Sequence, residues 1–179
     1  LYAREVMSMN EVDAAAIASG TMWVRPIAAV LAGTVGDRFR IPYTTVGCFV
    51  CLGLFSSLLA SDVIHAASTT LFVITIGSTA AMVFALRGLY FAMIQDAAVP
   101  IRLTGTAVGL VSAIGFLPDV FMGPFMGYLL DRSPGRDGHA DVFAVVAVFA
   151  AIGCIATIGV SRLGRVTTAD NLKQPSIDR

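Results

Sequence analysis

Residues 41–60 read IPYTTVGCFVCLGLFSSLLA and contain no charged side chain. A helix of about 20 apolar residues is long enough to cross the hydrocarbon core of a bilayer, which is about 30 Å thick. Lipid offers no hydrogen-bond partner to the backbone, so a segment that crosses it must satisfy its own N–H and C=O groups. We therefore expect residues 41–60 to form a transmembrane helix.

Four further stretches of this kind occur along the chain. The five predicted spans are residues 13–36, 41–60, 68–94, 104–130 and 142–160. Charged residues make up only 13% of the chain, and hydrophobic residues make up 56%. An ordinary soluble domain has about 25% charged residues. The sequence predicts an all-α integral membrane protein with five transmembrane helices.

The predicted five-helix bundle covers residues 13–161 and lies between two segments of different composition. Residues 1–12 mix polar and apolar side chains, and we expect an external segment that ends a preceding helix or loop. Residues 162–179 are polar, and we expect a disordered cytoplasmic tail. Because the chain begins with Leu and no signal peptide precedes the first span, we expect a piece of a longer protein.

Arginines near the span ends predict the orientation in the membrane. Five of them belong to one side, namely Arg38, Arg40, Arg102, Arg162 and Arg165. Three belong to the other side, namely Arg4, Arg132 and Arg136. Because cytoplasmic loops carry an excess of Lys and Arg, we expect the first group in the cytoplasm and the amino end outside. The expected location is the inner or plasma membrane, as a multi-pass protein surrounded by the lipid bilayer.

Residues 131–141 are rich in Pro, Gly and charge, which predicts an external loop. The side chains expected to be solvated there are Arg132, Arg136, Asp137, His139 and Asp141. Both histidines of the chain lie in predicted links, so the spans hold no nucleophile–base pair and no metal-ligand set. We expect no enzymatic activity, no metal and no cofactor. A formal net charge of zero gives no indication of nucleic-acid binding.

Cys48 and Cys51 form a C-x-x-C pattern inside an apolar stretch. A zinc or redox site needs exposed thiolates and further ligands, and neither a histidine nor a second cysteine pair is nearby. We interpret these two residues, and Cys154 in the last span, as small core residues.

Three charged side chains interrupt the spans: Arg25, Arg87 and Asp119. A charge inside the membrane is costly and usually faces a protein interior or a water-filled cavity. At 1.5 Å per residue, Arg25 lies roughly 18 Å and Asp119 roughly 22 Å from the cytoplasmic end, so the two can meet as a structural pair or serve a solute. Arg87 lies only about 12 Å in, and its side chain can extend towards the cytoplasm or the headgroups.

Two aromatic residues lie next to these arginines in the sequence, Trp23 beside Arg25 and Tyr90 beside Arg87. Either ring can stack on or hydrogen-bond a ligand, and either can simply fill the bundle. Packing in the bundle interior is the more frequent role for an aromatic residue within a span. We therefore name both residues only as candidates for solute binding.

The residues that close the first span read GTVGDRFR, from Gly33 to Arg40. Asp37 can accept hydrogen bonds at the start of a neighbouring helix, and Arg38 can bind helix-end carbonyls or lipid phosphates. Gly33 would allow another helix to approach closely. A plain cytoplasmic turn is the alternative. The G-x-x-x-D-R pattern resembles the signature loop of the major facilitator superfamily, although Arg40 stands where the family has a further Gly.

This resemblance implies the eighth to twelfth helices of a twelve-helix transporter, forming most of a six-helix bundle. An amino-terminal half would precede them. In that family the eighth, tenth and eleventh helices border the central cavity, and the ninth and twelfth face lipid. The three spans that carry charge correspond to the first group and the two charge-free spans to the second, which we also expect from the cost of charge in lipid.

The fourth predicted span carries two G-x-x-x-G patterns, Gly105 to Gly109 and Gly123 to Gly127, which predict close helix contacts. Pro118 and Pro124 predict a bend. The run from Gly115 to Asp119, with Gly123-Pro124 and Leu130-Asp131 after it, is similar to the eleventh helix of organophosphate and sugar-phosphate permeases.

Together these features predict a secondary active transporter that moves a small anionic solute by alternating access. Arg25 would bind the anion, Arg87 would assist it, and Asp119 would be a counter-charge or proton site, with H⁺ or a counter-anion as the coupled ion. Gly33, Asp37 and Arg38 would form a gating loop. The alternative is a non-transporting solute sensor on the same fold, and a membrane-embedded enzyme ranks last.

Overall fold

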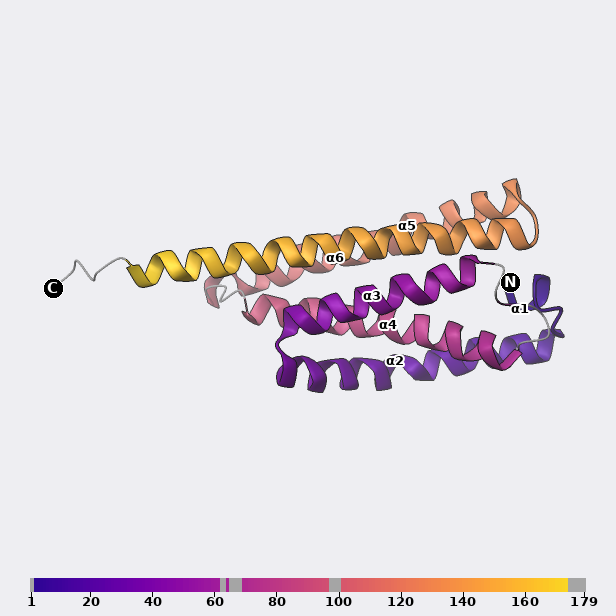
Figure 1. The fold of residues 1–179 in the computed structure, drawn as a ribbon, viewed down its shortest axis with the longest axis horizontal. Helices are drawn as coiled ribbons and strands as arrows, with labels where there is room; N and C mark the ends of the chain where they lie inside the picture. The colour runs from indigo at the N-terminus through magenta and orange to yellow at the C-terminus, as the bar shows by residue number, and fades with distance from the viewer. Residues whose placement is uncertain (1, 62–63, 65–68, 97–100, 174–179) are drawn as a thin grey trace.

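The computed structural model describes residues 2–61, 64, 69–96 and 101–173, and every regular element in these ranges is a helix. The helices are α1 (Tyr2–Glu5), α2 (Glu11–Phe39), α3 (Ile41–Ala60), α4 (Thr69–Asp96), α5 (Ile101–Arg132) and α6 (Arg136–Lys173). Five of them, α2 to α6, are long and apolar enough to cross a membrane (Figure 1). The prediction of an all-α integral membrane protein is confirmed.

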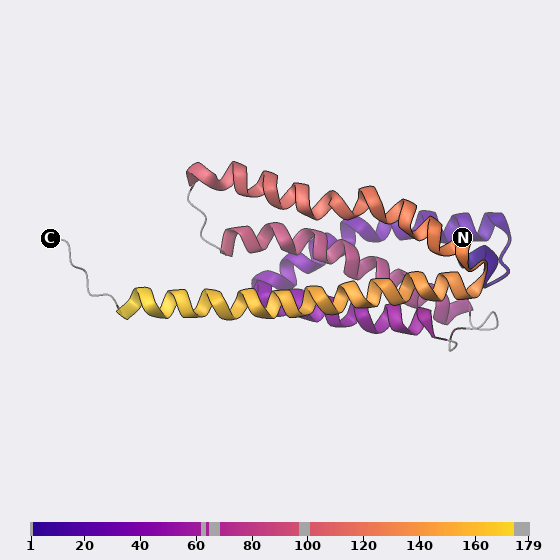
Figure 2. The same cartoon turned by 90° about the horizontal axis from the view of Figure 1, so that it is seen from above.

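The five long helices run side by side along one axis and alternate in direction (Figures 1 and 2). The carboxyl ends of α2 and α4 and the amino ends of α3 and α5 lie at the same end of the bundle, and α6 projects beyond that end. The segment around α1 and the α5–α6 turn lie at the opposite end. The helices therefore alternate in direction as the sequence predicts, and α1 and the carboxyl end of α6 lie at opposite ends of the bundle.

A single residue connects α2 to α3. Asp37 and Arg38 lie in the last turn of α2, and Arg40 alone reverses the chain with φ 71° and ψ 124°. A positive φ in a non-glycine residue is strained by about 1–3 kcal/mol. Pro42 suits the first turn of α3 because its missing N–H has no helical partner there. The predicted loop is therefore mostly helical.

The other end of the bundle also has less loop than the sequence predicts. Only residues 133–135 separate α5 from α6, and Gly135 with φ 84° makes the turn, so the loop expected over residues 131–141 is wrong in extent. The tail is helical as far as Lys173, where disorder was expected. A helix satisfies its own backbone outside the bilayer too, and the next proline is Pro175.

Helices α2 and α4 meet through small side chains. Ala28, Ala32 and Gly36 are buried along one side of α2 at intervals of four residues. A Cβ added to Gly36 would lie 3.1 Å from Leu89 Cδ2, and one added to Gly88 would lie 3.7 Å from the Ala29 carbonyl oxygen. Small residues at such spacing let two membrane helices approach backbone to backbone.

No helix among the described residues makes the close approach predicted at Gly33, because a Cβ added there would meet nothing within 4 Å. Gly33 lies three residues from Gly36, which places it on a neighbouring part of the helix surface but outside the interface. In the sequence, the buried side is indicated by small residues at intervals of four, namely Ala28, Ala32 and Gly36.

Helices α3 and α6 form the most extensive interface in the described part of the chain. Gly53 faces Ala150, and the ring of Phe49 occupies the space where Gly153 lacks a side chain. The buried Thr45 hydroxyl is satisfied within its own helix, since Oγ1 donates to the Ile41 carbonyl oxygen at 2.8 Å, whereas the buried Ser56 Oγ has no hydrogen-bond partner among the described residues. Such bonds let polar residues lie in a bundle interior that water does not reach.

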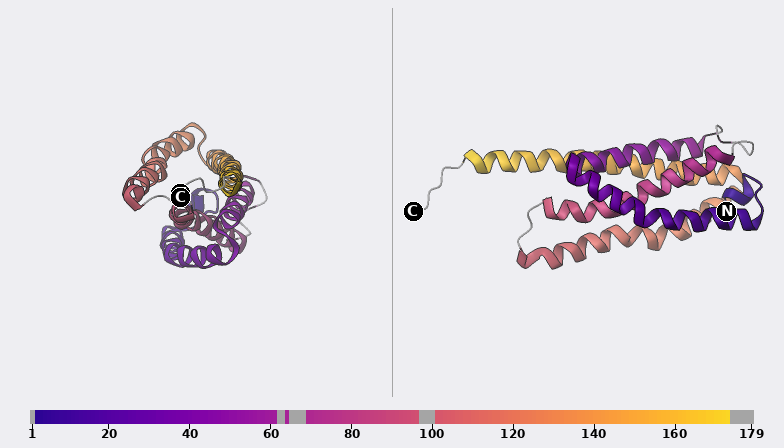
Figure 3. Two further views of the ribbon diagram at one scale, coloured as in Figure 1. Left: turned by 90° about the vertical axis from the view of Figure 1, so that its left-hand side faces the viewer. Right: turned by 90° about the horizontal axis from the view of Figure 1, so that it is seen from below.

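Helix α5 is the least buried of the five spans. None of its residues is buried, and within the described residues it contacts only α4 and α6. Figure 3 (left) shows it apart from α2, α3 and α4 when the bundle is viewed end on. The close contacts predicted at its two G-x-x-x-G patterns are absent from the described structure, since all four glycines would meet nothing within 4 Å. The helix is continuous through Pro118 and Pro124.

We expect Gly153→Ala to destabilise the protein and Gly159→Ala on the same helix to leave it nearly unchanged. A methyl group at position 153 would overlap the Phe49 ring, whereas one at position 159 would meet nothing within 4 Å. Overpacking of this kind costs about 1–3 kcal/mol. Thermal unfolding of both variants in detergent micelles measures the difference, and equal midpoints would contradict the α3–α6 packing.

Candidate functional site

Arg25 lies at the centre of α2, which runs from Glu11 to Phe39. The helix begins at Asn10, whose side chain accepts from the Asp13 backbone N–H at 2.7 Å. The Arg25 guanidinium lies over the Phe84 ring of α4, with Cζ 5.8 Å from the ring centroid. A guanidinium at this distance is attracted by the negative face of the ring.

Arg87 and Asp119 form the ion pair that connects α4 to α5. Arg87 Nη2 donates to Asp119 Oδ1 at 2.5 Å, and the two side chains are 30% and 51% exposed. Arg87 also lies over the Phe116 ring, with Cζ 5.5 Å from the centroid. The structure therefore pairs Asp119 with Arg87, where the sequence suggested Arg25. Arg87 extends sideways to α5 and not towards the headgroups, because a carboxylate is within reach.

Tyr90 reinforces the same contact one turn further along α4. Its Cζ atom lies 3.4 Å from where a Cβ on Gly115 would stand, so the ring packs against the α5 backbone. Arg87 and Tyr90 are three residues apart, and Gly115 and Asp119 are four apart, so each pair shares one side of its helix. The ion pair, the Phe116 contact and this ring contact lie within about one turn of each helix.

Arg25, Arg87 and Asp119 lie at nearly the same level in the bundle. Phe84 contacts Arg25, and Arg87 follows Phe84 by three residues, a rise of about 4.5 Å on the same side of α4. The candidate site therefore spans α2, α4 and α5, with α4 in the middle. Phe84 and Phe116 were not anticipated, although the spacings Phe84-x-x-Arg87 and Phe116-x-x-Asp119 were visible in the sequence.

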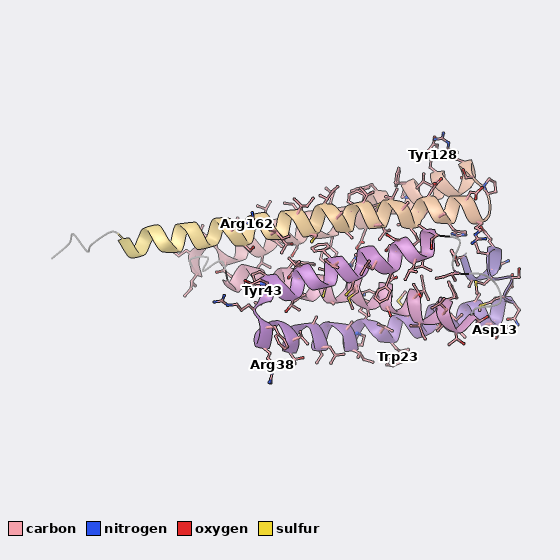
Figure 4. All side chains as sticks on the ribbon, in the orientation of Figure 1. Asp13, Trp23, Arg38, Tyr43, Tyr128 and Arg162 are labelled. Atoms are coloured by element: carbon pink, nitrogen blue, oxygen red, sulfur yellow. The ribbon has the colours of Figure 1, made fainter. Side chains whose placement is uncertain are left out.

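The other predicted site residues lie elsewhere. Trp23 is 76% exposed, and Figure 4 shows it on the outer side of α2. Gly33, Asp37 and Arg38 are exposed in the last turns of α2, and Arg38 points away from the bundle (Figure 4). Within the described residues neither Asp37 nor Arg38 has an ion pair or a side-chain hydrogen bond. The structure does not bring the predicted gating loop near the charged site.

The charged site has an excess of positive charge. Asp119 is paired with Arg87, and no carboxylate among the described residues lies within 4 Å of the Arg25 guanidinium. A guanidinium offers five N–H donors in a planar fork that fits carboxylate and phosphate oxygens. No group of three or more metal-ligating side chains occurs in the described ranges. Chemically, the arrangement is suited to holding an anion.

A second cluster of polar residues lies at the end of the bundle that holds α1. His139 Nε2 lies 3.0 Å from Glu5 Oε2, and the imidazole is 6% exposed. The prediction that His139 is solvated in a loop is wrong, since it lies in the first turn of α6 against α1. Burial raises the pKa of the neighbouring Tyr2 phenol, and the positive charge of Arg136 partly offsets this effect.

Two curated proteins of Escherichia coli strain K12 are similar to the chain. The first, "Inner membrane protein YihN", is 38% identical over 78 residues, which are 44% of this chain and 18% of that protein. The second, "Inner membrane protein YqcE", is 35% identical over 88 residues, which are 49% of this chain and 20% of that protein. The matched residues thus span about one fifth of each relative's length. No family model and no solved structure matches the chain.

These relatives and the five long apolar helices define the class of the protein. It is an all-α, multi-pass integral membrane protein of the inner membrane, and its spans are surrounded by the lipid bilayer. The predicted fold class and location are thereby confirmed.

A double-mutant cycle tests which arginine Asp119 serves. We expect Arg87→Ala and Asp119→Ala each to destabilise the protein, and the double variant to lose less than their sum, with a coupling free energy of about 0.5–3 kcal/mol. The matched cycle of Arg25→Ala with Asp119→Ala should be additive. Unfolding free energies in detergent micelles provide the measurement. Coupling in the Arg25 cycle without coupling in the Arg87 cycle would contradict the observed pairing.

Proposed function

We propose that the protein is a secondary active transporter of the major facilitator superfamily and that α2 to α6 correspond to its eighth to twelfth helices. The proposal is supported by the G-x-x-x-D-R pattern that ends at Arg38, by the number of spans and by their alternation. The transport mechanism would be alternating access, in which two helical bundles move about a site near the membrane midplane.

The observation that carries the proposal is the Arg25 guanidinium. It lies at the centre of a membrane-spanning helix, is exposed at the surface of this bundle, and has no carboxylate partner among the described residues. Placing such a charge at the bilayer centre costs about 2.5–3.5 kcal/mol on insertion scales. A water-accessible cavity that receives an anion offsets this cost, and a lipid-facing position does not.

The distribution of burial is consistent with a second bundle facing this one. We compare the most apolar 18-residue stretch of each helix. In α5 none of these residues is buried and in α2 6% are, against 22% in α3 and in α4. The helices that carry Arg25 and Asp119 are thus the least covered. We propose that an amino-terminal half of the same transporter covers these two helices and supplies the other side of the solute site.

The solute would be a small anion, such as an organic or sugar acid, a phosphate ester or inorganic phosphate. Arg25 would bind it bidentately, because a guanidinium matches the geometry of carboxylate and phosphate. Arg87 would assist when its bond to Asp119 opens. Asp119 would act as the counter-charge or as the proton site, and H⁺ or a counter-anion would be the coupled ion. Tyr90 would line the same region.

We expect Arg25→Ala to abolish solute uptake by the full-length protein in proteoliposomes, and Arg25→Lys to retain only part of it. Lysine keeps the charge but not the planar pair of donors. Uptake is measured with a panel of labelled probes, namely inorganic phosphate, a sugar acid and a phosphate ester. Arg132→Ala, which removes an exposed arginine at the end of α5, is the matched control and should transport normally.

Wild-type uptake by Arg25→Ala would contradict the proposal. Binding of a probe without accumulation would contradict transport and favour the alternative, a non-transporting solute sensor on the same fold. Elution of each variant as a monodisperse species on size-exclusion chromatography establishes that loss of uptake does not reflect misfolding.

A further inference from the structure

Phe84 lies against the Arg25 guanidinium and belongs to the same helix as Arg87. The Cζ atom of Arg25 is 5.8 Å from the centroid of the Phe84 ring. A cation within about 6 Å of a ring centroid is attracted by the negative face of the ring. Phe84 is half-buried, whereas Arg25 is exposed at the surface of the bundle. The ring is therefore the more firmly held member of this pair.

The position of the Phe84 ring relative to α2 is fixed one turn further along both helices. Helices α2 and α4 run in the same direction (Figure 1), and Ala29 and Gly88 follow Arg25 and Phe84 by four residues each. A Cβ added to Gly88 would lie 3.7 Å from the Ala29 carbonyl oxygen, so the two backbones approach closely there. A close contact between two helices thus presents the ring to Arg25.

Arg25 and Arg87 are held in different ways. Arg87 lies over the Phe116 ring and also pairs with Asp119. Within the described residues the Arg25 side chain contacts the Phe84 ring but has neither an ion pair nor a side-chain hydrogen bond. A carboxylate would neutralise a guanidinium and accept its N–H groups, whereas a ring attracts it through an uncharged face. Arg25 therefore keeps its charge and its N–H donors available to another group.

An arginine side chain is long and has many rotamers, and ordering such a side chain when a ligand binds lowers the affinity. A site in which the side chain is already ordered binds more tightly for that reason. The Phe84 ring provides this ordering for Arg25, because the attraction to its face favours the rotamers that bring the guanidinium over the ring.

We propose that Phe84 is a positioning residue of the anion site, whose ring holds the Arg25 guanidinium in place for the solute without touching the solute itself. This inference rests on the proposed function, since it needs an anion that binds at Arg25. Because the ring acts through its negative face, the affinity for the anion depends on the electron density of the ring and not on its volume.

The experiment replaces Phe84 in the full-length protein by phenylalanine analogues that carry one, two or three fluorine atoms on the ring. Fluorine withdraws electron density from the ring face and hardly changes the shape of the ring, so the attraction for a cation weakens while the packing is kept. The Kd values of labelled inorganic phosphate, a sugar acid and a phosphate ester are measured on purified protein in detergent micelles. We expect the Kd of the probe that binds to rise with each fluorine and to reach about ten times the wild-type value with three.

Two controls separate positioning from packing. Phe84→Tyr keeps a ring with a negative face and should bind the probe like the wild type. The same fluorinated series at Phe149, an exposed ring on α6, should leave the Kd unchanged. In proteoliposomes the variant with three fluorine atoms should show a raised KM and the wild-type kcat, because a binding interaction has been weakened. If that variant does not elute as a monodisperse species, the forms with one and two fluorine atoms decide.

The outcomes separate this inference from the proposed transport. A constant Kd across the Phe84 series, in a protein that takes up the probe, would overturn the inference and leave transport standing. A graded Kd without uptake would contradict transport and support the positioning role. A wild-type protein that binds none of the three probes would overturn both.

Discussion

The pairing of Asp119 with Arg87 determines how the remaining charge in the spans is arranged. The middle parts of the membrane-spanning helices carry two guanidinium groups and one carboxylate, so one arginine must do without a carboxylate among these residues. The structure leaves Arg25 in that position, with its guanidinium over the Phe84 ring. A charge at mid-span without such compensation is costly, which is the reason for proposing that Arg25 binds a solute.

The helices are joined by two physically different kinds of contact. Helices α2 and α4 meet through alanine and glycine, where backbones approach closely and little movement is possible without losing contact. Helix α5 is attached to α4 through an ion pair, a ring over a guanidinium and a ring against a glycine. Polar contacts of this kind can exchange one partner for another. The α2–α4 contact is thus made of closely packed small residues, whereas the α4–α5 contact is made of polar and aromatic side chains.

The sequence predicted the five spans to within a few residues at most ends, because apolar length is the signal that membranes require. The structure places Arg25 and Asp119 in the middle parts of α2 and α5. The choice of partner could not be predicted, because depth fixes the level of a side chain along the bundle but not its direction around the helix. For that reason Arg87 was expected either to extend towards the cytoplasm or the headgroups or to assist Arg25, and its pairing with Asp119 of α5 was not foreseen.

Other differences have equally specific causes. The close helix contact was predicted at Gly33 because that residue belongs to the G-x-x-x-D-R pattern. The small residues at intervals of four, Ala28, Ala32 and Gly36, identify the side that is buried. His139 was assigned to a solvated loop because its neighbours are polar, and only the fold brings Glu5 to it across 134 residues. The segment beyond Arg162 was expected to be disordered because its composition is polar. Composition does not show that a helix can continue from a stable span, as α6 does to Lys173.

The most direct test of the account is whether position 25 is in contact with water within the membrane. In the full-length protein without its native cysteines, Arg25→Cys should react with a charged, membrane-impermeant thiosulfonate in intact membranes. Ile155→Cys, at an exposed apolar position in the middle of α6, should not react. If Arg25→Cys reacts only with a lipid-soluble reagent, as Ile155→Cys is expected to do, position 25 faces lipid and the account is wrong.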